Sequence, residues 1–187
     1  MPLSAATKTL LVVGDSLSAA YGIDVSAGWV AKLQDRLRQN SLDYNIVNAS
    51  ISGDTTANGL ARLPRLLDEH HPQIVVIELG GNDGLRGLSL PEMQHNIKTM
   101  VEKAKSQDAK VLLLGVRLPP NYGKTYTERF QKVYVDVAKD SKVPLVSFIL
   151  EGIATDRALM QADGLHPDAQ AQSKVLENVW VALQPLL

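Results

Sequence analysis

The stretch Thr9-Leu10-Leu11-Val12-Val13-Gly14 decides how this chain folds. Its apolar run has no polar alternation, which is typical of a strand buried on both faces of a parallel sheet. The glycine that ends the run allows the chain to turn tightly. Asp15-Ser16-Leu17 follows at once. Because ligands bind beyond the carboxyl ends of parallel strands, Ser16 stands at a position where chemistry is expected.

The chain on either side of this run alternates between strand-like and helix-like segments. Expected strands cover residues 9–13, 44–48, 73–79, 111–116 and 144–149. Helical spacing of apolar residues predicts helices around 29–37, 55–70, 90–104, 130–138 and 167–183, the second bent or restarted at Pro64. This order predicts an α/β class chain with a three-layer α/β/α flavodoxin-like fold and a five-stranded parallel sheet, order 2-1-3-4-5. No linker or repeat is evident, so residues 1–187 are expected to form a single domain.

Composition excludes several function classes. The net charge of the 187 residues is −1, which gives no electrostatic reason to expect nucleic acid as a partner. The absence of cysteine excludes a thiol nucleophile, a disulfide framework and a cysteine zinc site. No apolar run approaches the ~18 residues of a membrane span. The first six residues, 1–6, lack the pattern of a signal peptide, so we expect a protein that stays inside the cell or one whose export signal has been removed.

Three residues from opposite ends of the chain predict nucleophilic catalysis. A serine alone in a strand-to-helix turn is usually a helix cap. Late in the chain, however, Asp163 precedes His166 by three residues in a short loop that contains a glycine. Such a carboxylate can accept the Nδ1 proton of the histidine and leave Nε2 to face a serine hydroxyl. Ser16, Asp163 and His166 are therefore the candidate catalytic residues.

Two further loops offer hydrogen-bond donors for the oxyanion that attack by a serine generates. Gly53 follows the second expected strand, and Asn82 follows the third. Together with the Ser16 amide, the Gly53 amide and the Asn82 side chain form a candidate oxyanion hole. Asp15, Asp54 and Asp83 also lie on these loops, and we interpret them as structural carboxylates that bond to loop amides. We expect no metal and no cofactor.

These motifs, in this order, resemble those of the SGNH hydrolases, also called the GDSL family, which is named for a Ser, a Gly, an Asn and a His in successive blocks. The resemblance covers nearly the whole chain and is closest to the bacterial multifunctional thioesterase/lysophospholipase/protease members and their arylesterase relatives. The strings that carry it are Gly14-Asp15-Ser16-Leu17-Ser18-Ala19, Asn48-Ala49-Ser50-Ile51-Ser52-Gly53-Asp54-Thr55, Glu78-Leu79-Gly80-Gly81-Asn82-Asp83-Gly84-Leu85-Arg86-Gly87 and Arg117-Leu118-Pro119-Pro120-Asn121-Tyr122-Gly123.

The resemblance implies the same triad and oxyanion hole. It also implies that the 84–89 loop moves when substrate binds and that Leu118 lies near the acyl chain. Leu118, Gly84, Leu85 and Arg86 are thus the expected substrate-binding residues. Members of this kind are commonly exported, so the resemblance implies a periplasmic location, while a cytoplasmic one stays open.

The expected function is a serine hydrolase of carboxylic esters and thioesters that passes through an acyl-enzyme on Ser16. The partner is then a small acyl or aryl ester or thioester, and we expect a monomer. A carbohydrate acetyl esterase with the same triad is the alternative enzyme. A non-catalytic flavodoxin-like module, such as a phosphate-receiving domain, is the alternative from another class. That fold would place an acidic pair after the first strand and a lysine after the fifth, whereas this chain has Asp15 alone and Glu151-Gly152.

Overall fold

The structure, a computed structural model, describes residues 7–187. Residues 1–6, where the sequence lacks a signal-peptide pattern, lie outside the described residues. The strands are β1 (Lys8–Gly14), β2 (Tyr44–Asn48), β3 (Ile74–Glu78), β4 (Lys110–Leu114) and β5 (Leu145–Val146). They form one parallel sheet in the order β2-β1-β3-β4-β5, which confirms the predicted topology.

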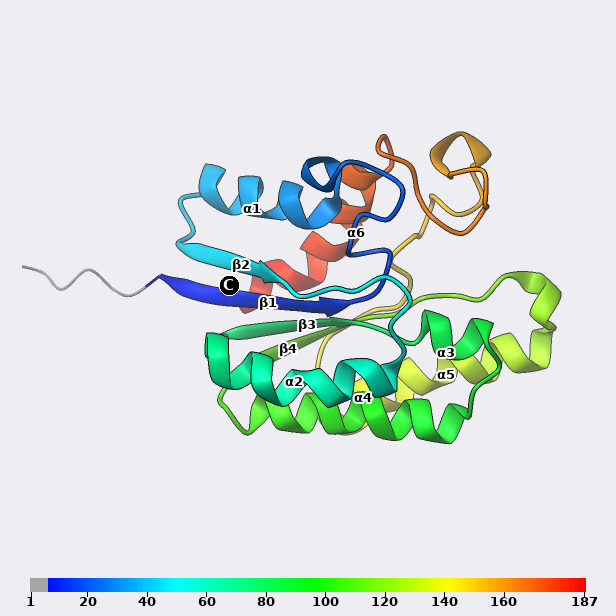
Figure 1. Ribbon diagram of the computed structural model, residues 1–187, viewed down its shortest axis with the longest axis horizontal. Helices are drawn as coiled ribbons and strands as arrows, with labels where there is room; N and C mark the ends of the chain where they lie inside the picture. Colours follow the sequence, from blue (N-terminus) through cyan, green and yellow to red (C-terminus); the bar gives the residue numbers. More distant parts are fainter. Residues whose placement is uncertain (1–6) are drawn as a thin grey trace, which may run out of the picture.

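Helices cover both faces of the sheet, as Figure 1 shows. Their bounds are α1 (Trp29–Gln39), α2 (Thr56–His70), α3 (Gly81–Leu85), α4 (Leu90–Lys105), α5 (Lys124–Ser141) and α6 (Gln172–Leu183). Helices α1 and α6 pack together on one face, and α2, α4 and α5 cover the other. Short 3-10 turns occupy Val25–Ala27, Pro120–Tyr122, Arg157–Leu159 and Gln184–Leu186. The three-layer arrangement confirms the predicted fold class.

The apolar runs of the sequence form the middle layer. The side chains of Leu10, Leu11, Val12 and Val13 in β1 are fully buried, and so is the whole of β3 within about two per cent. Burial on both faces explains why these strands lack alternation. Helix α2 begins with a capping box in which Thr55 and Asn58 satisfy each other's backbone N–H groups. Such local signals fix where each connection turns back onto the sheet.

Some boundaries differ from the sequence-based prediction. Strand β5 has two residues instead of six, because the chain leaves the sheet after Val146. Helix α6 begins at Gln172 and not at Pro167, since Pro167 pairs with Met160 in an isolated antiparallel bridge. Helix α2 runs through Pro64 without restarting. The glycine-rich segment after β3, expected as a loop, instead forms the short helix α3.

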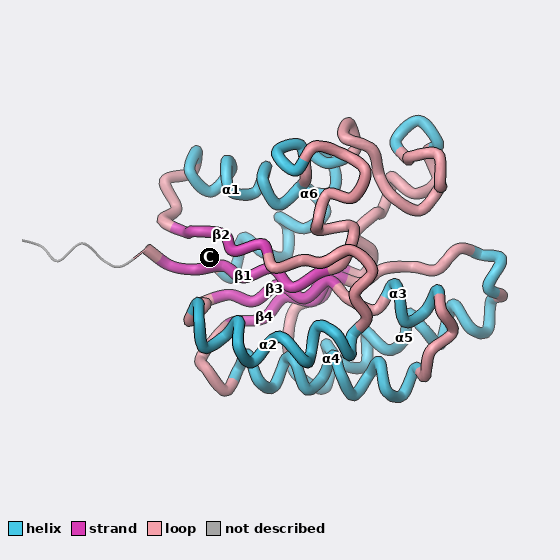
Figure 2. Tube along the Cα trace, viewed as in Figure 1, coloured by secondary structure: helices cyan, strands magenta, loops and turns pink. Residues whose placement is uncertain are grey.

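The connections that follow the strands gather at one rim of the sheet. Figure 2 shows loops gathered at one end of the sheet, the end toward which the strand arrows of Figure 1 point. The segments after β1, β2 and β3 carry Ser16, Gly53 and Asn82, and the loop before α6 carries His166. The fold therefore places every candidate block on the same rim. In residues 7–187, no helix is both long and apolar enough to cross a membrane.

Candidate active site

Ser16 lies in a tight turn directly after β1. The amide of Ala19 donates to the carbonyl of Asp15 at 2.9 Å, and the amide of Tyr21 donates to the carbonyl of Ser16 at 3.1 Å. Gly14 is required here because a Cβ atom on it would lie 2.8 Å from the Ser18 hydroxyl and 2.9 Å from the Glu78 carboxylate. The turn leaves the Ser16 side chain partly exposed while its neighbours Asp15 and Ser18 are buried.

The hydroxyl of Ser16, the ring of His166 and the carboxylate of Asp163 form one continuous chain. The Nε2 atom of His166 lies 2.8 Å from Ser16 Oγ, and its Nδ1 atom lies 2.6 Å from Asp163 Oδ2. With the proton on Nδ1 donated to the carboxylate, Nε2 is left as an acceptor for the serine hydroxyl. The structure thus brings together the three residues that the sequence proposed as catalytic.

The loop that carries Asp163 holds this carboxylate ionised. Its Oδ1 atom accepts hydrogen bonds from the amides of Leu165 at 2.9 Å and His166 at 3.0 Å. Partial burial raises the pKa of Asp163, but these amides and the imidazole outweigh burial and lower the pKa to about 2. Asp163 therefore stays anionic throughout the ordinary working range of an enzyme and orients the imidazole.

Tyr21, which the sequence analysis did not single out, flanks the imidazole. Its ring centroid lies 4.6 Å from that of His166, with a 41° angle between the planes. The side-chain amide of Gln161 donates to the carbonyls of Tyr21 at 2.8 Å and Pro167 at 3.0 Å. This link ties the serine turn to the histidine loop, although about 140 residues separate them in the chain. No motif in the sequence marks such a bridge.

Two backbone amides of the candidate oxyanion hole are free. Neither the Ser16 nor the Gly53 amide donates to an acceptor within residues 7–187. Gly53 has a φ of +87°, a conformation that glycine adopts without strain. Its carbonyl is held by Arg86, whose guanidinium donates to it at 2.9 Å. Free N–H groups at this rim are the donors that a developing oxyanion requires.

The third expected donor, the Asn82 side chain, already has partners. Its Nδ2 atom donates to Asp15 Oδ2 at 3.2 Å and to the carbonyl of Asp54 at 3.0 Å. These two bonds place the amide between the serine loop and the loop after β2. Because both N–H groups are engaged, donation to an oxyanion requires that one of them be shared. The sequence predicted the residue but not these partners.

The expected substrate-binding residues lie around α3. Leu118 is 8% exposed, and a Cβ on Gly84 would meet it at 2.7 Å, so the two residues pack directly together. The carbonyl of Leu85 accepts from the Tyr122 hydroxyl at 2.9 Å, while Arg86 bonds to the Gly53 carbonyl. The segment is therefore anchored to both neighbouring loops. Whether it moves or contacts an acyl chain stays a prediction.

The additional carboxylates of the rim act as hydrogen-bond acceptors. Asp15 Oδ1 accepts from the Leu17 amide at 3.1 Å. Asp83 accepts from Thr56 through its amide at 2.9 Å and its hydroxyl at 2.6 Å. Asp54 pairs with Arg62 at 2.8 Å. These bonds match the interpretation of the three aspartates as structural. Within residues 7–187, no three side chains of His, Asp or Glu gather where they could hold a metal ion.

Arg62 is a residue that sequence reasoning missed. From α2 its guanidinium reaches Asp54, the carbonyl of Gly14 at 3.4 Å and the carbonyl of Ala49. One side chain therefore joins the ends of β1 and β2 to the loop that carries Gly53. An arginine on a predicted amphipathic helix is expected to face solvent. Its bridging position becomes evident only in the structure, where three chain segments meet at the side chain.

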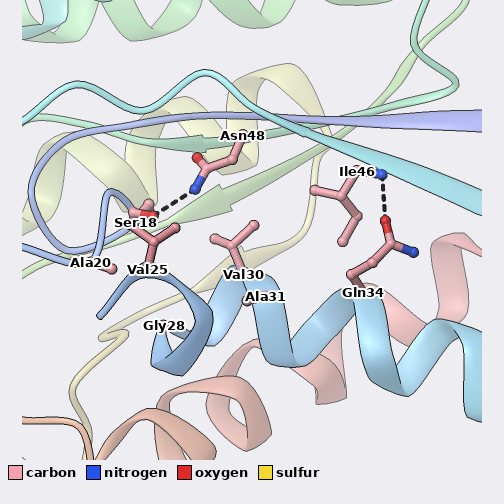
Figure 3. A pocket seen from close by; sticks show the side chains of 9 residues that line it. All are labelled: Ser18, Ala20, Val25, Gly28, Val30, Ala31, Gln34, Ile46 and Asn48. Atoms are coloured by element: carbon pink, nitrogen blue, oxygen red, sulfur yellow. Dashed lines mark hydrogen bonds between the residues drawn. The ribbon is translucent and has the colours of Figure 1, made fainter. Parts of the chain in front are cut away.

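A cavity of about 180 Å³ lies on the other side of the serine turn, between α1 and β2 (Figure 3). Ser18, Val25 and Ile46 are among its lining residues. Figure 3 shows the Asn48 amide donating to the Ser18 carbonyl at its edge, a bond of 2.9 Å. Ser16, Asp163 and His166 do not line this cavity. It is therefore separate from the triad.

A flavodoxin-like parallel sheet in the order 2-1-3-4-5 with a hydroxyl–imidazole–carboxylate chain at its carboxyl rim defines the class of serine hydrolases. The model of the GDSL-like lipase/acylhydrolase family matches residues 12–174 of the chain. This stretch includes every candidate catalytic residue. The chain belongs to the GDSL-like lipase/acylhydrolase family.

Relatives agree with this assignment over most of their length. The chain is 60% identical to esterase TesA of Pseudomonas aeruginosa PAO1, covering 98% of this chain and 91% of the relative. It is 46% identical to an arylesterase of Vibrio mimicus (94% and 88% covered). It is 44% identical to thioesterase 1/protease 1/lysophospholipase L1 of Escherichia coli K12 (98% and 87% covered).

Solved structures are similar as well. The crystal structure of TesA matches with a TM-score of 0.95 at 59% identity, covering 96% of this chain and all of that one. The psychrotrophic esterase EstA from Pseudoalteromonas sp., inhibited by monoethylphosphonate, matches with a TM-score of 0.91 at 39% identity, covering 95% and 97%.

Proposed function

We propose that this protein hydrolyses carboxylic esters and thioesters through an acyl-enzyme formed on Ser16. The observation that carries the proposal is the hydrogen-bonded chain from Ser16 through His166 to Asp163. Family membership and relatives named esterase, arylesterase and thioesterase/lysophospholipase support the same reaction.

In the first half of the reaction, Ser16 Oγ attacks the carbonyl carbon of the substrate. His166 Nε2 takes the hydroxyl proton as the new C–O bond forms, and Asp163 stabilises the resulting imidazolium. The tetrahedral intermediate then collapses. The bond to the leaving oxygen or sulfur breaks, and His166 gives its proton to the departing alcohol or thiol. Acyl-Ser16 and a neutral imidazole remain.

Water completes the second half. Nε2 of His166 removes a proton from a water molecule, whose oxygen attacks the acyl carbonyl of the intermediate. Collapse of this second tetrahedral intermediate returns the proton to Ser16 Oγ and releases a carboxylic acid. The same imidazole thus works in both directions, and the net reaction consumes one water.

Charge on the carbonyl oxygen is stabilised by the amides of Ser16 and Gly53 and by the side chain of Asn82. The two amides lack acceptors within the described chain, so they lose no protein hydrogen bond when the oxyanion appears. Such preorganised donors cost no rearrangement at the moment of reaction. A metal ion is not needed in this mechanism.

The acyl chain would lie against the segment of Gly84, Leu85 and Arg86 and against Leu118. The apolar side chains of Leu85 and Leu118 in this region would favour acyl or aryl substrates over sugars. Hydrolysis of p-nitrophenyl esters of graded length, together with acyl-CoA thioesters, tests both substrate and mechanism. We expect turnover by the wild type and a loss of several orders of magnitude in Ser16→Ala with the fold unchanged. A clear preference for acetylated sugars would instead support the carbohydrate esterase.

We further propose that residues 1–187 form one domain, that the protein works as a monomer and that it acts in the periplasm. Resemblance to exported members of the family supports the location. Light scattering at micromolar concentration tests the monomer, and a mass of twice 20.3 kDa would contradict it. Fractionation of cells that express the natural gene tests the location.

A further inference from the structure

Two carboxyl groups are buried against each other beneath the serine turn. Glu78, the last residue of β3, is 0% exposed, and Asp15, which precedes the serine, is 3% exposed. Glu78 stands opposite Gly14 in the register of β1 and β3, so its side chain crosses directly under the turn. Buried like charges of this kind cannot both ionise without a compensating cation.

Glu78 has one oxygen with partners and one without. Its Oε2 atom accepts from the Ser18 hydroxyl at 2.8 Å and from the Asp15 amide at 3.4 Å. Its Oε1 atom is buried and accepts no hydrogen bond within residues 7–187. A buried carboxylate oxygen without a donor is costly. The same atom carrying a proton would be a donor, and the neighbouring Asp15 carboxylate is an acceptor.

Asp15 has the opposite pattern. Its Oδ1 atom accepts from the Leu17 amide, and its Oδ2 atom accepts from the Asn82 side chain. Donors on both oxygens favour the ionised form. The two environments therefore favour one protonation state of the pair, in which Glu78 carries the proton and Asp15 carries the negative charge.

The other groups near the pair do not supply a cation. Arg62 from α2 donates to the Gly14 carbonyl, but its charge is paired with Asp54. Tyr134 from α5 uses its hydroxyl on the Leu79 carbonyl at 2.9 Å. His166 bonds to Asp163 and Ser16 and to neither member of the pair. Burial, with the charge of Asp15 adding to it, raises the pKa of Glu78 well above its ordinary value, and burial raises the pKa of Asp15 to about 6.

We propose that Glu78 is a positioning residue. It keeps a proton on Oε1 and donates a hydrogen bond through it to the Asp15 carboxylate. This bond fixes the carboxylate that holds the Asn82 amide and the backbone after Ser16. The inference rests on the proposed function, because Asn82 matters only if it stabilises an oxyanion. No proton leaves Glu78 during turnover. It acts through Asp15 and never contacts substrate.

Infrared spectroscopy tests the protonation independently of activity. A protonated carboxyl has a carbonyl stretching band apart from those of carboxylates, and it shifts in D2O. We expect this band in the wild type at pH 8 and its loss in Glu78→Gln. Asp83→Asn is the matched control, because Asp83 is also buried but accepts donors from Thr56 on both oxygens. The control should keep the band. No band in the wild type, or a band that persists in Glu78→Gln, overturns the proposal.

Kinetics test the positioning role. Glu78→Gln keeps a donor toward Asp15 and should retain kcat within about threefold, whereas Glu78→Leu should lower kcat by about 10–100-fold with KM nearly unchanged. Equal kcat in the folded Leu variant and the wild type would overturn the role, as would a Gln variant as slow as the Leu variant. If the Leu variant does not fold, kcat of Glu78→Gln decides alone: retention supports the proposal, and a loss of more than about 10-fold contradicts it. Failure of the proposed function itself differs, because wild type and variants would then all lack turnover while the infrared band stays.

Discussion

The Nε2 atom of His166 lies 2.8 Å from Ser16 Oγ, although 150 positions of chain separate the two residues. The parallel sheet makes this meeting possible, because the segment after β1 and the loop before α6 reach the same rim. Gln161 fixes the approach by bonding to the carbonyls of Tyr21 and Pro167. The histidine is thus held in place by backbone contacts as well as by Asp163.

Replacing Asp163 with asparagine should leave the fold intact and lower kcat by about 10⁴-fold, because the amide favours the wrong imidazole tautomer. Steady-state hydrolysis of a p-nitrophenyl ester measures the loss. Asp156→Asn is the matched control, since Asp156 is another exposed loop carboxylate that accepts from a backbone amide two residues on. Similar activity in the two variants would contradict the role assigned to Asp163.

Removing the side chain of Asn82 should lower kcat by about 10²–10³-fold through loss of one oxyanion donor. Asn178→Ala serves as the control, because its amide also donates twice to backbone carbonyls, those of Ile149 and Glu151. The control should lose stability and keep its kcat. If Asn82→Ala retained kcat and lost only stability, Asn82 would be a purely structural bridge between Asp15 and Asp54.

Arg62 should matter for stability far more than its neighbour Arg65 on α2. The Arg62 side chain is 21% exposed and joins three chain segments, whereas Arg65 is 88% exposed. Arg62→Ala should lower the free energy of unfolding by about 2–4 kcal/mol, because Asp54 is left without its partner. Arg65→Ala should change it by less than about 0.5 kcal/mol. Urea denaturation measures both, and equal effects would contradict the bridging role.

The proton on Glu78 should make stability depend on pH. Above its ordinary pKa of 4.5 the unfolded carboxyl loses its proton while folded Glu78 keeps it, so folding takes up a proton. The free energy of unfolding should therefore fall as pH rises, by up to about 1.4 kcal/mol per pH unit. Asp15, whose pKa is raised from 3.8 to about 6, lowers stability in the same direction, but only between pH 3.8 and about pH 6.

Comparing the wild type with Glu78→Gln from pH 6 to 9 isolates this contribution, since all other titrating groups are common to both proteins. We expect the difference in unfolding free energy to grow with pH in favour of the Gln variant. Parallel curves for the two proteins would show that Glu78 ionises normally and contradict the buried proton.

Much of this molecule was predictable because its signals are local. The uninterrupted apolar run of β1 indicated a strand buried on both faces, and the residues after β1, β2 and β3 indicated one functional rim. Asp163 and His166 are three residues apart, so their contact follows from a short loop. The handedness of the crossovers limited the possible strand orders, and the expected order 2-1-3-4-5 is the one observed.

The remainder depends on contacts that have no local pattern. Glu78 is a single carboxyl at the end of an apolar strand, and its burial against Asp15 follows only from the register of β1 and β3. The position of Arg62 depends on three chain segments that converge on its guanidinium. The start of α6 moved to Gln172 because Pro167 pairs with Met160, a long-range backbone choice that helix signals do not report.

The most direct measurement is the mass of the protein after treatment with a serine-reactive phosphonate. We expect one covalent adduct in the wild type, located on Ser16 by peptide mapping and formed in step with the loss of esterase activity. Ser16→Ala should gain no adduct, and its turnover should fall by several orders of magnitude. An adduct on another residue, or full ester hydrolysis by Ser16→Ala, would contradict the assignment of Ser16 as the nucleophile.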